Sequence, residues 1–297
     1  MITFVVVTWN NEELIEDFFS SMKKYCKVEY KVIVVDNCSS DNTVSQIKKY
    51  AGDNCKIIEN SSNVGFARAN NIALHYVDTK YICYINPDII FIEDITEELI
   101  DILNKNKEVG VVGPKLLNKD MSYQKSDFNF EHGFKLIKSQ LNIFSKVLSV
   151  DKKPKSQNVD WIIGAVMLLS TEDALRIKGF SEEYFMYIED MDLCKKVSQV
   201  LHKKTYFDSN TSIIHLGGQS ERKNKNYKKD EIILRNIVLF NKKFYKNEKL
   251  AIYELKLCYF LKMLFSKIRK SVKRNEENTI IFDRMKNSYE FMKKYNI

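Results

Sequence analysis

Short apolar strands alternate with helical stretches along the first third of the chain. Runs of aliphatic and β-branched residues predict four buried strands, at Ile2–Val7, Lys31–Val35, Lys56–Glu59 and Tyr81–Ile85. Apolar residues spaced three and four apart predict the helices between and after them, at Asn11–Tyr25, Asn42–Ala51, Phe66–Val77 and Ile95–Asn104. Continuous apolar strands are typically covered on both faces, so this order predicts an α/β fold with a Rossmann-like, mostly parallel sheet flanked by helices.

The rest of the chain is less regular. It contains predicted strands at Val109–Pro114, Trp161–Ser170 and Ser212–His215, a helix at Asp190–Leu201 and a loop-rich insertion at Lys119–Lys155. Three further helices are predicted at Glu231–Phe244, Ala251–Arg274 and Phe282–Tyr295. The polar, basic run Glu221–Lys229 separates the two patterns. We therefore predict an α/β domain over residues 1–220 and a helical C-terminal extension over residues 221–297.

The composition is typical of a globular protein of a reducing compartment. Hydrophobic residues make up 44% of the 297 residues, which is enough to fill a core. The six cysteines form no Cys-x-x-Cys pair, which argues against a zinc knuckle or a disulfide framework and favours reduced thiols. Met1 leads directly into a predicted core strand, and no apolar run reaches the roughly 18 residues of a membrane span. A cytoplasmic location is therefore expected.

The charge is unevenly distributed. Residues 221–297 hold 21 Lys and Arg against 9 Asp and Glu, a balance of +12 in a chain whose net charge is +8. The first 220 residues are therefore mildly acidic, at −4. A basic tail is expected to contact a polyanion, either an anionic membrane surface or a nucleic acid.

Two aspartates directly follow predicted strands. In an open α/β sheet the ligand crevice lies beyond the carboxyl ends of the strands, where Asp36 and Asp88 both fall. Each is also compatible with a turn residue that only satisfies backbone donors, although polar neighbours could serve the turn at Asp36 equally well. Pro87 stiffens the turn before Asp88, and a carboxylate there suits Mg²⁺ or Mn²⁺.

Three carboxylates crowd the start of a predicted helix, at Glu189, Asp190 and Asp192. Helix capping is one explanation, because the positive end of the helix dipole favours acidic residues. The other is chemical. Aromatic and apolar residues flank the acids, and burial among them would raise a carboxylate pKa toward that of a general base.

His215 ends a predicted strand and is followed by two glycines. Glycines allow close backbone approach to a bulky group, and imidazole is a common metal ligand. Metal ligation and structural packing are equally compatible with this residue.

Seven short segments occur in a characteristic order within residues 1–220. They are Val5–Asn10, Val34–Thr43, Asn63–Asn71, Asn86–Asp88, Trp161–Ala165, Tyr187–Leu193 and His215–Ser220. Each is weakly specific, but together they resemble family 2 glycosyltransferases with a GT-A-type fold, particularly the rhamnosyltransferase-like branch. The insertion at 119–155 and the residues after 221 lie outside this resemblance.

The resemblance implies a nucleotide site. Thr8 and Asp36 would hold the nucleobase and ribose of a nucleotide-sugar donor, and Arg68 would lie near the base or diphosphate. Asn86 would also belong to this site. It stands where many relatives carry Asp, so the metal site has one anionic ligand fewer than in those relatives.

The resemblance also implies a metal and a catalytic site. Asp88 occupies the last position of the family's Asp-x-Asp motif and would bind Mn²⁺ or Mg²⁺, with His215 as a second ligand. Asp190 would be the catalytic base. Glu189 beside it would touch the acceptor, and Trp161 would help form the acceptor pocket.

The implied reaction is a metal-dependent, inverting transfer of a sugar, with dTDP-rhamnose favoured, to a hydroxyl of a cell-surface glycan or lipid-linked acceptor. The metal would offset charge on the leaving diphosphate, and no enzyme nucleophile is needed. The alternatives are a UDP-hexose, UDP-GlcNAc or galactofuranose donor on the same fold, or a non-catalytic glycan-binding or nucleic-acid-binding protein.

The segment Leu255–Arg274 is predicted to form a basic amphipathic helix. Such a helix lies in a membrane interface, and each basic residue near anionic lipid contributes about 1 kcal/mol. We expect peripheral contact with the inner face of the cell membrane. The alternative is packing against the catalytic body or another subunit, in a homo-oligomer. No nucleic-acid motif is recognised, so nucleic-acid binding is not expected.

Overall fold

A computed structural model describes residues 1–130, 154–217 and 227–295. The chain divides into two compact units, which we call the sheet unit (Met1–Asn129 and Pro154–Lys223) and the helical unit (Phe130–Lys153 and Asn224–Ile297). Most of the predicted insertion at 119–155 and of the predicted boundary at 221–229 lies outside the described residues. The division of the chain at residue 220 therefore stays a prediction.

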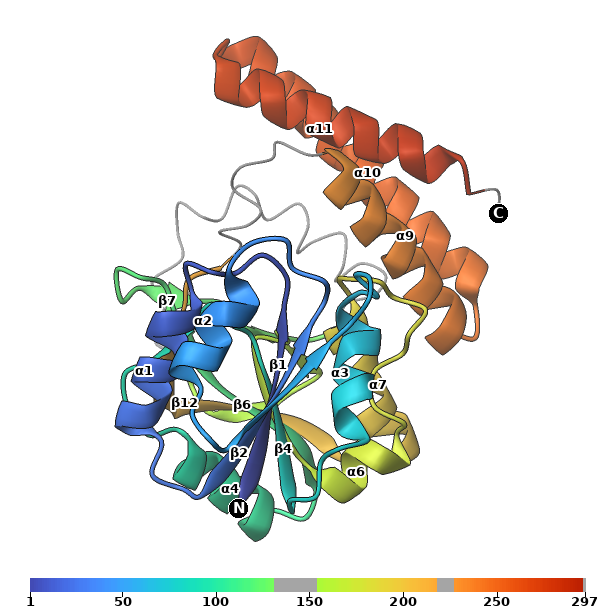
Figure 1. The fold of residues 1–297 in the computed structure, drawn as a ribbon. Helices are drawn as coiled ribbons and strands as arrows, with labels where there is room; N and C mark the ends of the chain where they lie inside the picture. Colours follow the sequence, from blue (N-terminus) through green and yellow to red (C-terminus); the bar gives the residue numbers. More distant parts are fainter. Residues whose placement is uncertain (131–153, 218–226, 296–297) are drawn as a thin grey trace. The chain divides into compact units, whose positions relative to one another are not determined.

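The first half of the sheet unit follows the predicted alternation (Figure 1). Its elements are β1 (Ile2–Thr8), α1 (Ile15–Tyr25), β2 (Tyr30–Asp36), α2 (Thr43–Tyr50), β3 (Cys55–Glu59), α3 (Phe66–Leu74), β4 (Tyr81–Ile85), β5 (Ile89–Phe91) and α4 (Thr96–Lys105). β1 pairs in parallel with β2 and β4, and β2 pairs in parallel with β3. The three-residue strand β5 was not predicted, because so short a run carries no readable periodicity.

The second half departs from the predictions in two places. Its elements are β6 (Val109–Leu117), β7 (Tyr123–Gln124), β8 (Asp127–Phe128), β9 (Gln157–Val159), β10 (Trp161–Ile162), β11 (Val166–Ser170), α6 (Thr171–Arg176), α7 (Glu189–Val200) and β12 (Lys204–His215). The single strand predicted at Trp161–Ser170 is wrong, because the chain breaks between β10 and β11. The strand predicted at Ser212–His215 is only the end of β12. The middle of β12 is polar and contains a β-bulge, where Asp208 accepts the backbone N–H of Thr211.

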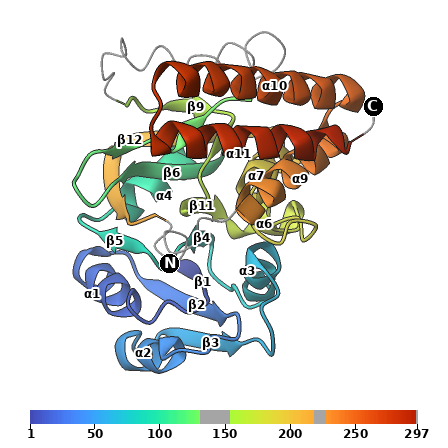
Figure 2. The ribbon, with the colours of Figure 1, turned by 90° about the horizontal axis from the view of Figure 1, so that it is seen from above.

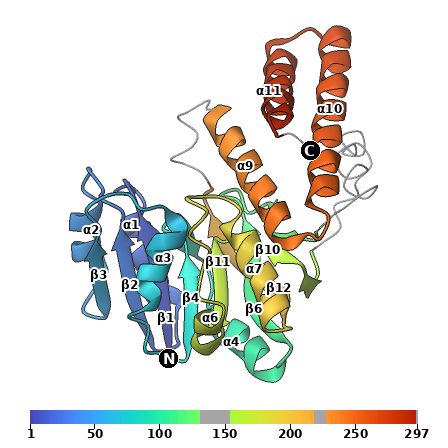
Figure 3. The ribbon, with the colours of Figure 1, turned by 90° about the vertical axis from the view of Figure 1, so that its right-hand side faces the viewer.

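Most strands form one mixed sheet, whose main path has the order β3-β2-β1-β4-β11-β6-β12-β5 (Figure 3). β7 pairs with β6 and β9 with β12 beside this path, and β8 and β10 form a separate two-stranded sheet. β11 is antiparallel to both β4 and β6, β12 is parallel to β6, and β5 is antiparallel to β12. The prediction of a mostly parallel sheet flanked by helices is confirmed.

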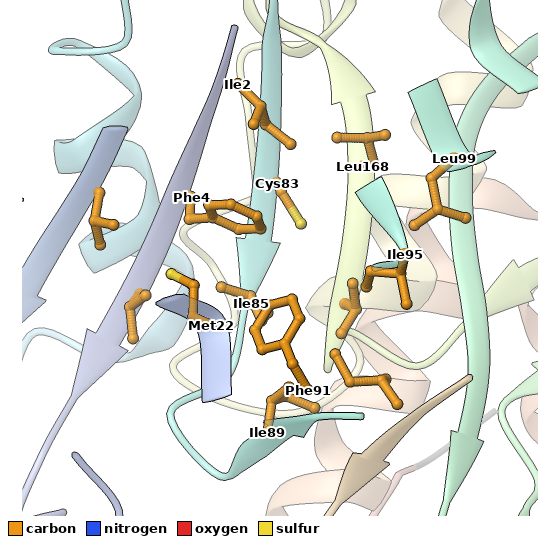
Figure 4. Packing of buried hydrophobic residues seen from close by; sticks show 14 of the residues in the cluster. Ile2, Phe4, Met22, Cys83, Ile85, Ile89, Phe91, Ile95, Leu99 and Leu168 are labelled. Atoms are coloured by element: carbon orange, nitrogen blue, oxygen red, sulfur yellow. The ribbon is translucent and has the colours of Figure 1, made fainter. Parts of the chain in front are cut away.

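Two hydrophobic clusters cover the two faces of the sheet. One joins the sheet to α1, α2 and α4, and the other joins it to α3, α6 and α7 (Figure 1). In the first cluster Phe4 packs edge-on against Phe91, with ring centroids 6.1 Å apart, beside Ile85 and Met22 (Figure 4). Full burial of each such side chain contributes about 1.5–3 kcal/mol to folding stability. This packing holds in place the strands whose carboxyl ends carry Asp36 and Asp88.

The helical unit contains α9 (Tyr227–Phe244), α10 (Glu248–Val272) and α11 (Glu276–Lys293). α10 and α11 lie side by side as an antiparallel hairpin (Figures 2 and 3). All three helices contribute to one buried cluster, which comprises Leu234 and Val238 of α9, Ile252 and Leu255 of α10, and Met292 of α11. Both helices begin earlier than predicted because Asn247 and Asn275 cap them, each accepting a backbone N–H three residues later.

Helix α10 carries apolar residues on two faces. Leu255 and Cys258 are buried within the helical unit, whereas Leu264, Ile268 and Val272 are exposed. The apolar stripe predicted for Leu255–Arg274 is thus divided between packing and solvent. Within the described residues, no helix is long and apolar enough to cross a membrane.

Candidate active site

The predicted nucleotide and metal residues lie at one edge of the sheet. Thr8 pairs with Asp36 at the ends of β1 and β2, and Val6 pairs with Ile85 at the end of β4. The carboxyl ends of these three parallel strands therefore coincide, and the segment Asn86-Pro87-Asp88 begins there. This is the edge at which ligands bind in open α/β sheets.

Asp36 is held as a fully bonded carboxylate at this edge. Its Oδ1 accepts the hydroxyl of Thr8 at 2.8 Å and that of Ser39 at 2.6 Å, and its Oδ2 accepts the backbone N–H of Ser39 at 2.8 Å. Asp36 is 2% exposed and Thr8 is 1% exposed. These bonds pre-orient the carboxylate and offset the cost of burying it.

Gly65 lies between the end of β2 and the segment that precedes Glu189 and Asp190. The amide of Asn37 donates to the carbonyl of Gly65 at 3.3 Å, and the backbone N–H of Phe66 donates to the carbonyl of Phe185 at 2.8 Å. Gly65 has φ +86°, and a Cβ there would lie 2.5 Å from the Phe185 carbonyl oxygen. Only glycine fits this contact.

Arg68 lies on the exposed side of α3. Its Nε is 3.9 Å from Glu182 Oε2, and both side chains are largely exposed. An exposed pair at this distance contributes little to stability and leaves the guanidinium able to move. Its role beside the base or diphosphate stays a prediction.

Asp88 and His215 are brought together by strand pairing. His215 pairs with Ile89 where β12 meets β5, and the backbone N–H of Leu216 donates to the Asp88 carbonyl at 2.9 Å. His215 Nε2 lies 3.3 Å from Asp88 Oδ1, with the two side chains 12% and 15% exposed. The last three residues of the predicted His215–Ser220 segment lie outside the described residues.

These residues suit a divalent cation. Within the described part of the chain, Asn86 Oδ1 and Asp88 Oδ1 are buried oxygens without a hydrogen-bond partner. A carboxylate, an amide oxygen and an imidazole nitrogen are ligands that Mn²⁺ accepts, and Mg²⁺ takes the oxygens. Across the described ranges no group of three His, Cys, Asp or Glu side chains is gathered. A cation here would therefore take further ligands from water and substrate phosphate.

Asp190 is positioned by two backbone donors. Its Oδ2 accepts the N–H of Gly164 at 2.9 Å, and its Oδ1 accepts the N–H of Met191 at 2.7 Å. Burial raises the pKa of Asp190, and these two hydrogen bonds oppose the shift. A Cβ on Gly164 would approach the Asp190 Cβ to 3.1 Å, so glycine allows the close contact.

Glu189 is buried beside Asp190. Its Oε2 has no hydrogen-bond partner among the described residues. Burial, and then the charge of Asp190, raise the pKa of Glu189 well above its ordinary value. The preceding residues Tyr187 and Ile188 both have positive φ, at 72° and 74°. Positive φ at a β-branched residue is rare and strained, and such strain commonly marks functional sites.

The residues between β10 and β11 contact both the candidate metal site and the carboxylate of Asp190 in α7. The backbone N–H of Asn86 donates to the carbonyl of Ala165 at 2.9 Å. The neighbouring residue Gly164 donates to Asp190. One short backbone segment, Gly164–Ala165, therefore contacts both the turn that carries Asp88 and the predicted base.

Trp161 stacks on Phe128. Their ring centroids are 4.4 Å apart and their planes differ by 15°, where β10 pairs with β8. The stack fixes one face of the indole. Phe128 lies in the predicted insertion and was not singled out, because a lone aromatic residue in a polar stretch carries no signal.

Removing the charge of Glu189 is expected to change how stability depends on pH. Because its pKa is raised in the folded state, Glu189 stabilises the protein below the unfolded-state pKa, and that contribution is lost as pH rises through the folded-state pKa. Glu189→Gln should therefore flatten the decline of the melting temperature between roughly pH 5 and pH 8. Identical pH profiles for the variant and the wild type would show that Glu189 is not held in this environment.

The mixed sheet and its flanking helices have the GT-A fold of solved glycosyltransferases. The mannosyltransferase PcManGT from Pyrobaculum calidifontis, solved with GDP-Man and Mn²⁺, aligns with 99% of this chain and 86% of its own at a TM-score of 0.62 and 14% identity. TarS residues 1–349 of Staphylococcus aureus, solved with UDP-GlcNAc, aligns with 99% and 83% at a TM-score of 0.54 and 18% identity. At these identities the likeness shows the fold.

The sequence identifies the family within this class. The model of glycosyl transferase family 2 matches residues 3–153, about half of the chain, and the chain belongs to that family. It is 29% identical over 211 residues to the rhamnosyltransferase WbbL of Escherichia coli, covering 67% of this chain and 77% of that protein. It is 23% identical over 248 residues to an N-acetylglucosaminyl-diphospho-decaprenol L-rhamnosyltransferase of Mycobacterium tuberculosis, covering 71% and 79%. The protein is a glycosyltransferase.

Proposed function

We propose that the protein transfers a sugar, with inversion, from a nucleoside diphosphate donor to a hydroxyl of a glycan or lipid-linked acceptor, using Mn²⁺ or Mg²⁺. The observation that carries this proposal is the line of contacts along one sheet edge. One part runs from Asn37, next to Asp36, to Gly65, and from the adjacent Phe66 to Phe185. The other part runs from Asp190 to Gly164, and from the adjacent Ala165 to Asn86, in the turn that places Asp88 beside His215.

Each residue then has a chemical role. Thr8, Asp36 and Arg68 bind the nucleotide, and Asn86 lies beside its diphosphate. A cation bound by Asp88 and His215 would offset the charge on the diphosphate oxygens.

Asp190 is the general base in this proposal. The acceptor oxygen forms a bond to the anomeric carbon as the bond from that carbon to the diphosphate oxygen breaks. The nucleoside diphosphate leaves with the electron pair, and the acceptor proton passes to Asp190. The two backbone N–H donors hold Asp190 in place. Burial raises the pKa of both acids, so the pair resists the simultaneous ionisation of both carboxyl groups. Glu189 and Trp161 contact the acceptor.

Among donors we favour dTDP-rhamnose, because two of the similar proteins are named as rhamnosyltransferases. A UDP-sugar is the second candidate, since TarS was solved with UDP-GlcNAc. Hydrolysis and transfer assays with dTDP-rhamnose, UDP-glucose, UDP-GlcNAc and UDP-galactofuranose, each with Mn²⁺ or with EDTA, test both. Turnover of one donor that EDTA abolishes supports the proposal, whereas turnover of no donor, or turnover that EDTA leaves unchanged, opposes it.

We also propose that the exposed stripe of α10, defined as Leu264, Ile268 and Val272, contacts an anionic membrane from the cytoplasmic side. These side chains are 37%, 58% and 84% exposed, and exposed basic residues lie beside them at Lys267, Arg269, Lys273 and Arg274. An apolar stripe with basic flanks is the pattern of an interfacial helix.

Replacing the three stripe residues by serine is expected to weaken binding to phosphatidylglycerol vesicles by about tenfold or more, because it removes apolar area that would enter the lipid. Co-sedimentation measures the effect, and deletion of 251–297 should abolish binding. Leu175→Ser, at a leucine on α6 that is 52% exposed, is the matched control. Equal sedimentation of the wild type and the triple variant would remove the membrane proposal.

A further inference from the structure

A chain of polar side chains leads from an exposed carboxylate to the candidate metal site. It lies between the end of β6 and β7 and was not singled out from the sequence, because glutamine and asparagine in a polar stretch carry no signal. It begins at Asp120, whose Oδ1 accepts the hydroxyl of Ser122 at 2.5 Å. Hydrogen bonds from Ser122, through both its hydroxyl and its backbone N–H, lower the pKa of Asp120, so this group is an acceptor only.

Because Asp120 can only accept, it determines which group donates in each hydrogen bond between these polar side chains. Because the Ser122 hydroxyl donates to Asp120, its oxygen accepts the side-chain amide of Asn118 at 2.9 Å. That bond orients Asn118, so its Oδ1 accepts Nε2 of Gln124 at 3.0 Å. The same Nε2 donates to the carbonyl of His215 at 3.2 Å.

The orientation of Gln124 fixes the tautomer of His215. With Nε2 of Gln124 facing two acceptors, its Oε1 faces His215 Nδ1 at 2.6 Å. Turning the amide over would place its oxygen against two other oxygens. Nδ1 must therefore be the donor, and the neutral ring carries its lone pair on Nε2.

This lone pair points into the candidate metal site. His215 Nε2 lies 3.3 Å from Asp88 Oδ1, a buried oxygen that accepts no hydrogen bond within the described residues. In the neutral ring these two electron-rich atoms repel each other, and either a proton or a metal cation between them would remove the repulsion. A metal-binding histidine almost always donates its other ring N–H to a carboxylate or carbonyl group, which fixes the tautomer and the ring orientation.

We propose that Gln124 is a positioning residue of the metal site, whose side-chain oxygen holds the His215 ring with its Nε2 lone pair directed at the cation. This rests on the proposed function, and it adds a residue that the sequence did not indicate.

The test compares Mn²⁺ affinities of the full chain, measured by EPR of free Mn²⁺ with the metal alone as probe. Gln124→Leu should weaken Mn²⁺ binding roughly 10- to 100-fold, which is typical for loss of such a partner. Gln124→Glu should keep the affinity within a few-fold, because a carboxylate still accepts the Nδ1 proton. Gln157→Leu, at an exposed glutamine of β9, is the matched control and should bind as the wild type does.

A second readout does not need the metal. In ¹⁵N spectra of the histidine rings of the metal-free protein, the neutral His215 ring should carry its proton on Nδ1 in the wild type and in Gln124→Glu, but not uniformly in Gln124→Leu. A purely structural role for Gln124 would instead lower the affinity and the melting temperature equally in both variants, which overturns the proposal.

A wrong positioning role and a wrong metal site give different results. If His215→Ala loses Mn²⁺ binding while Gln124→Leu keeps both the affinity and the tautomer, the positioning role is wrong and the metal site stands. If neither His215→Ala nor Asp88→Ala changes Mn²⁺ binding, the metal site itself is wrong.

Discussion

Replacing Asp190 with asparagine is expected to lower sugar transfer by about 10²- to 10⁴-fold while the donor still binds, because general-base catalysis typically contributes that much. Asparagine keeps the size of the side chain but removes the group that takes the acceptor proton. Steady-state transfer measures the rate, and calorimetry with the donor and Mn²⁺ measures binding. Transfer within about threefold of the wild type would show that another group is the base.

Asp190→Asn is also expected to lower the stability of the folded protein. Both carboxylate oxygens of Asp190 accept a backbone N–H, from Gly164 and Met191, so the amide nitrogen of asparagine must face one donor. Loss of one such bond costs about 1–3 kcal/mol of folding free energy. The melting temperature of Asp190→Asn is therefore expected to fall, and measuring it separates a loss of stability from a loss of catalysis. Asp101→Asn, at an exposed pair with Lys105 on α4, is the control for an ordinary Asp-to-Asn change.

Replacing Asp88 with asparagine is expected to lower both Mn²⁺ affinity and transfer, the latter by about 10²-fold or more. The charge stabilisation that a metal provides amounts to several kcal/mol, and each 1.36 kcal/mol corresponds to tenfold in rate. Unlike Asp190→Asn, this variant should lose donor affinity in the presence of Mn²⁺. EPR of free Mn²⁺ and donor calorimetry measure the two effects.

The outcome for Asp88 separates a metal role from a structural one. Asp88 Oδ1 accepts no hydrogen bond within the described residues, so asparagine removes charge without breaking a side-chain bond at that atom. The melting temperature of the metal-free variant should therefore stay close to that of the wild type. Normal Mn²⁺ binding and transfer by a folded Asp88→Asn protein would contradict the assignment.

Periodicity predicted the part of the fold that is built from regular, apolar elements. The strands from Ile2 to Ile85 are continuous apolar runs and the helices between them repeat apolar residues every 3.6 residues, and the structure confirms these elements. Periodicity failed where polar contacts decide the geometry. Polar residues around the bulge at Asp208 remove the strand pattern from most of β12, and the break at Gly164 lies in an apolar run that predicts one continuous strand.

The sequence indicated which residues belong to the candidate site, but it did not indicate the backbone geometry and long-range contacts that position them. Asp36 and Asp88 stood out because acids directly follow strands, and Glu189 and Asp190 stood out because aromatic residues flank them. Nothing in the sequence indicated that Ile188 adopts a positive φ, since that value is rare for a β-branched residue. Gln124 could not be found either, because it contacts a residue 91 positions away.

The central claim is that Asp88, His215 and Asp190 meet around one metal-bound donor. A crystal structure of the full chain with Mn²⁺ and the donor chosen by the hydrolysis panel tests it most directly. We predict an anomalous Mn²⁺ peak contacted by Asp88 Oδ1 and His215 Nε2, with the donor diphosphate on the same ion and the Asp190 carboxylate facing the anomeric carbon. Mn²⁺ bound at other residues, or an anomeric carbon remote from Asp190, would contradict the account.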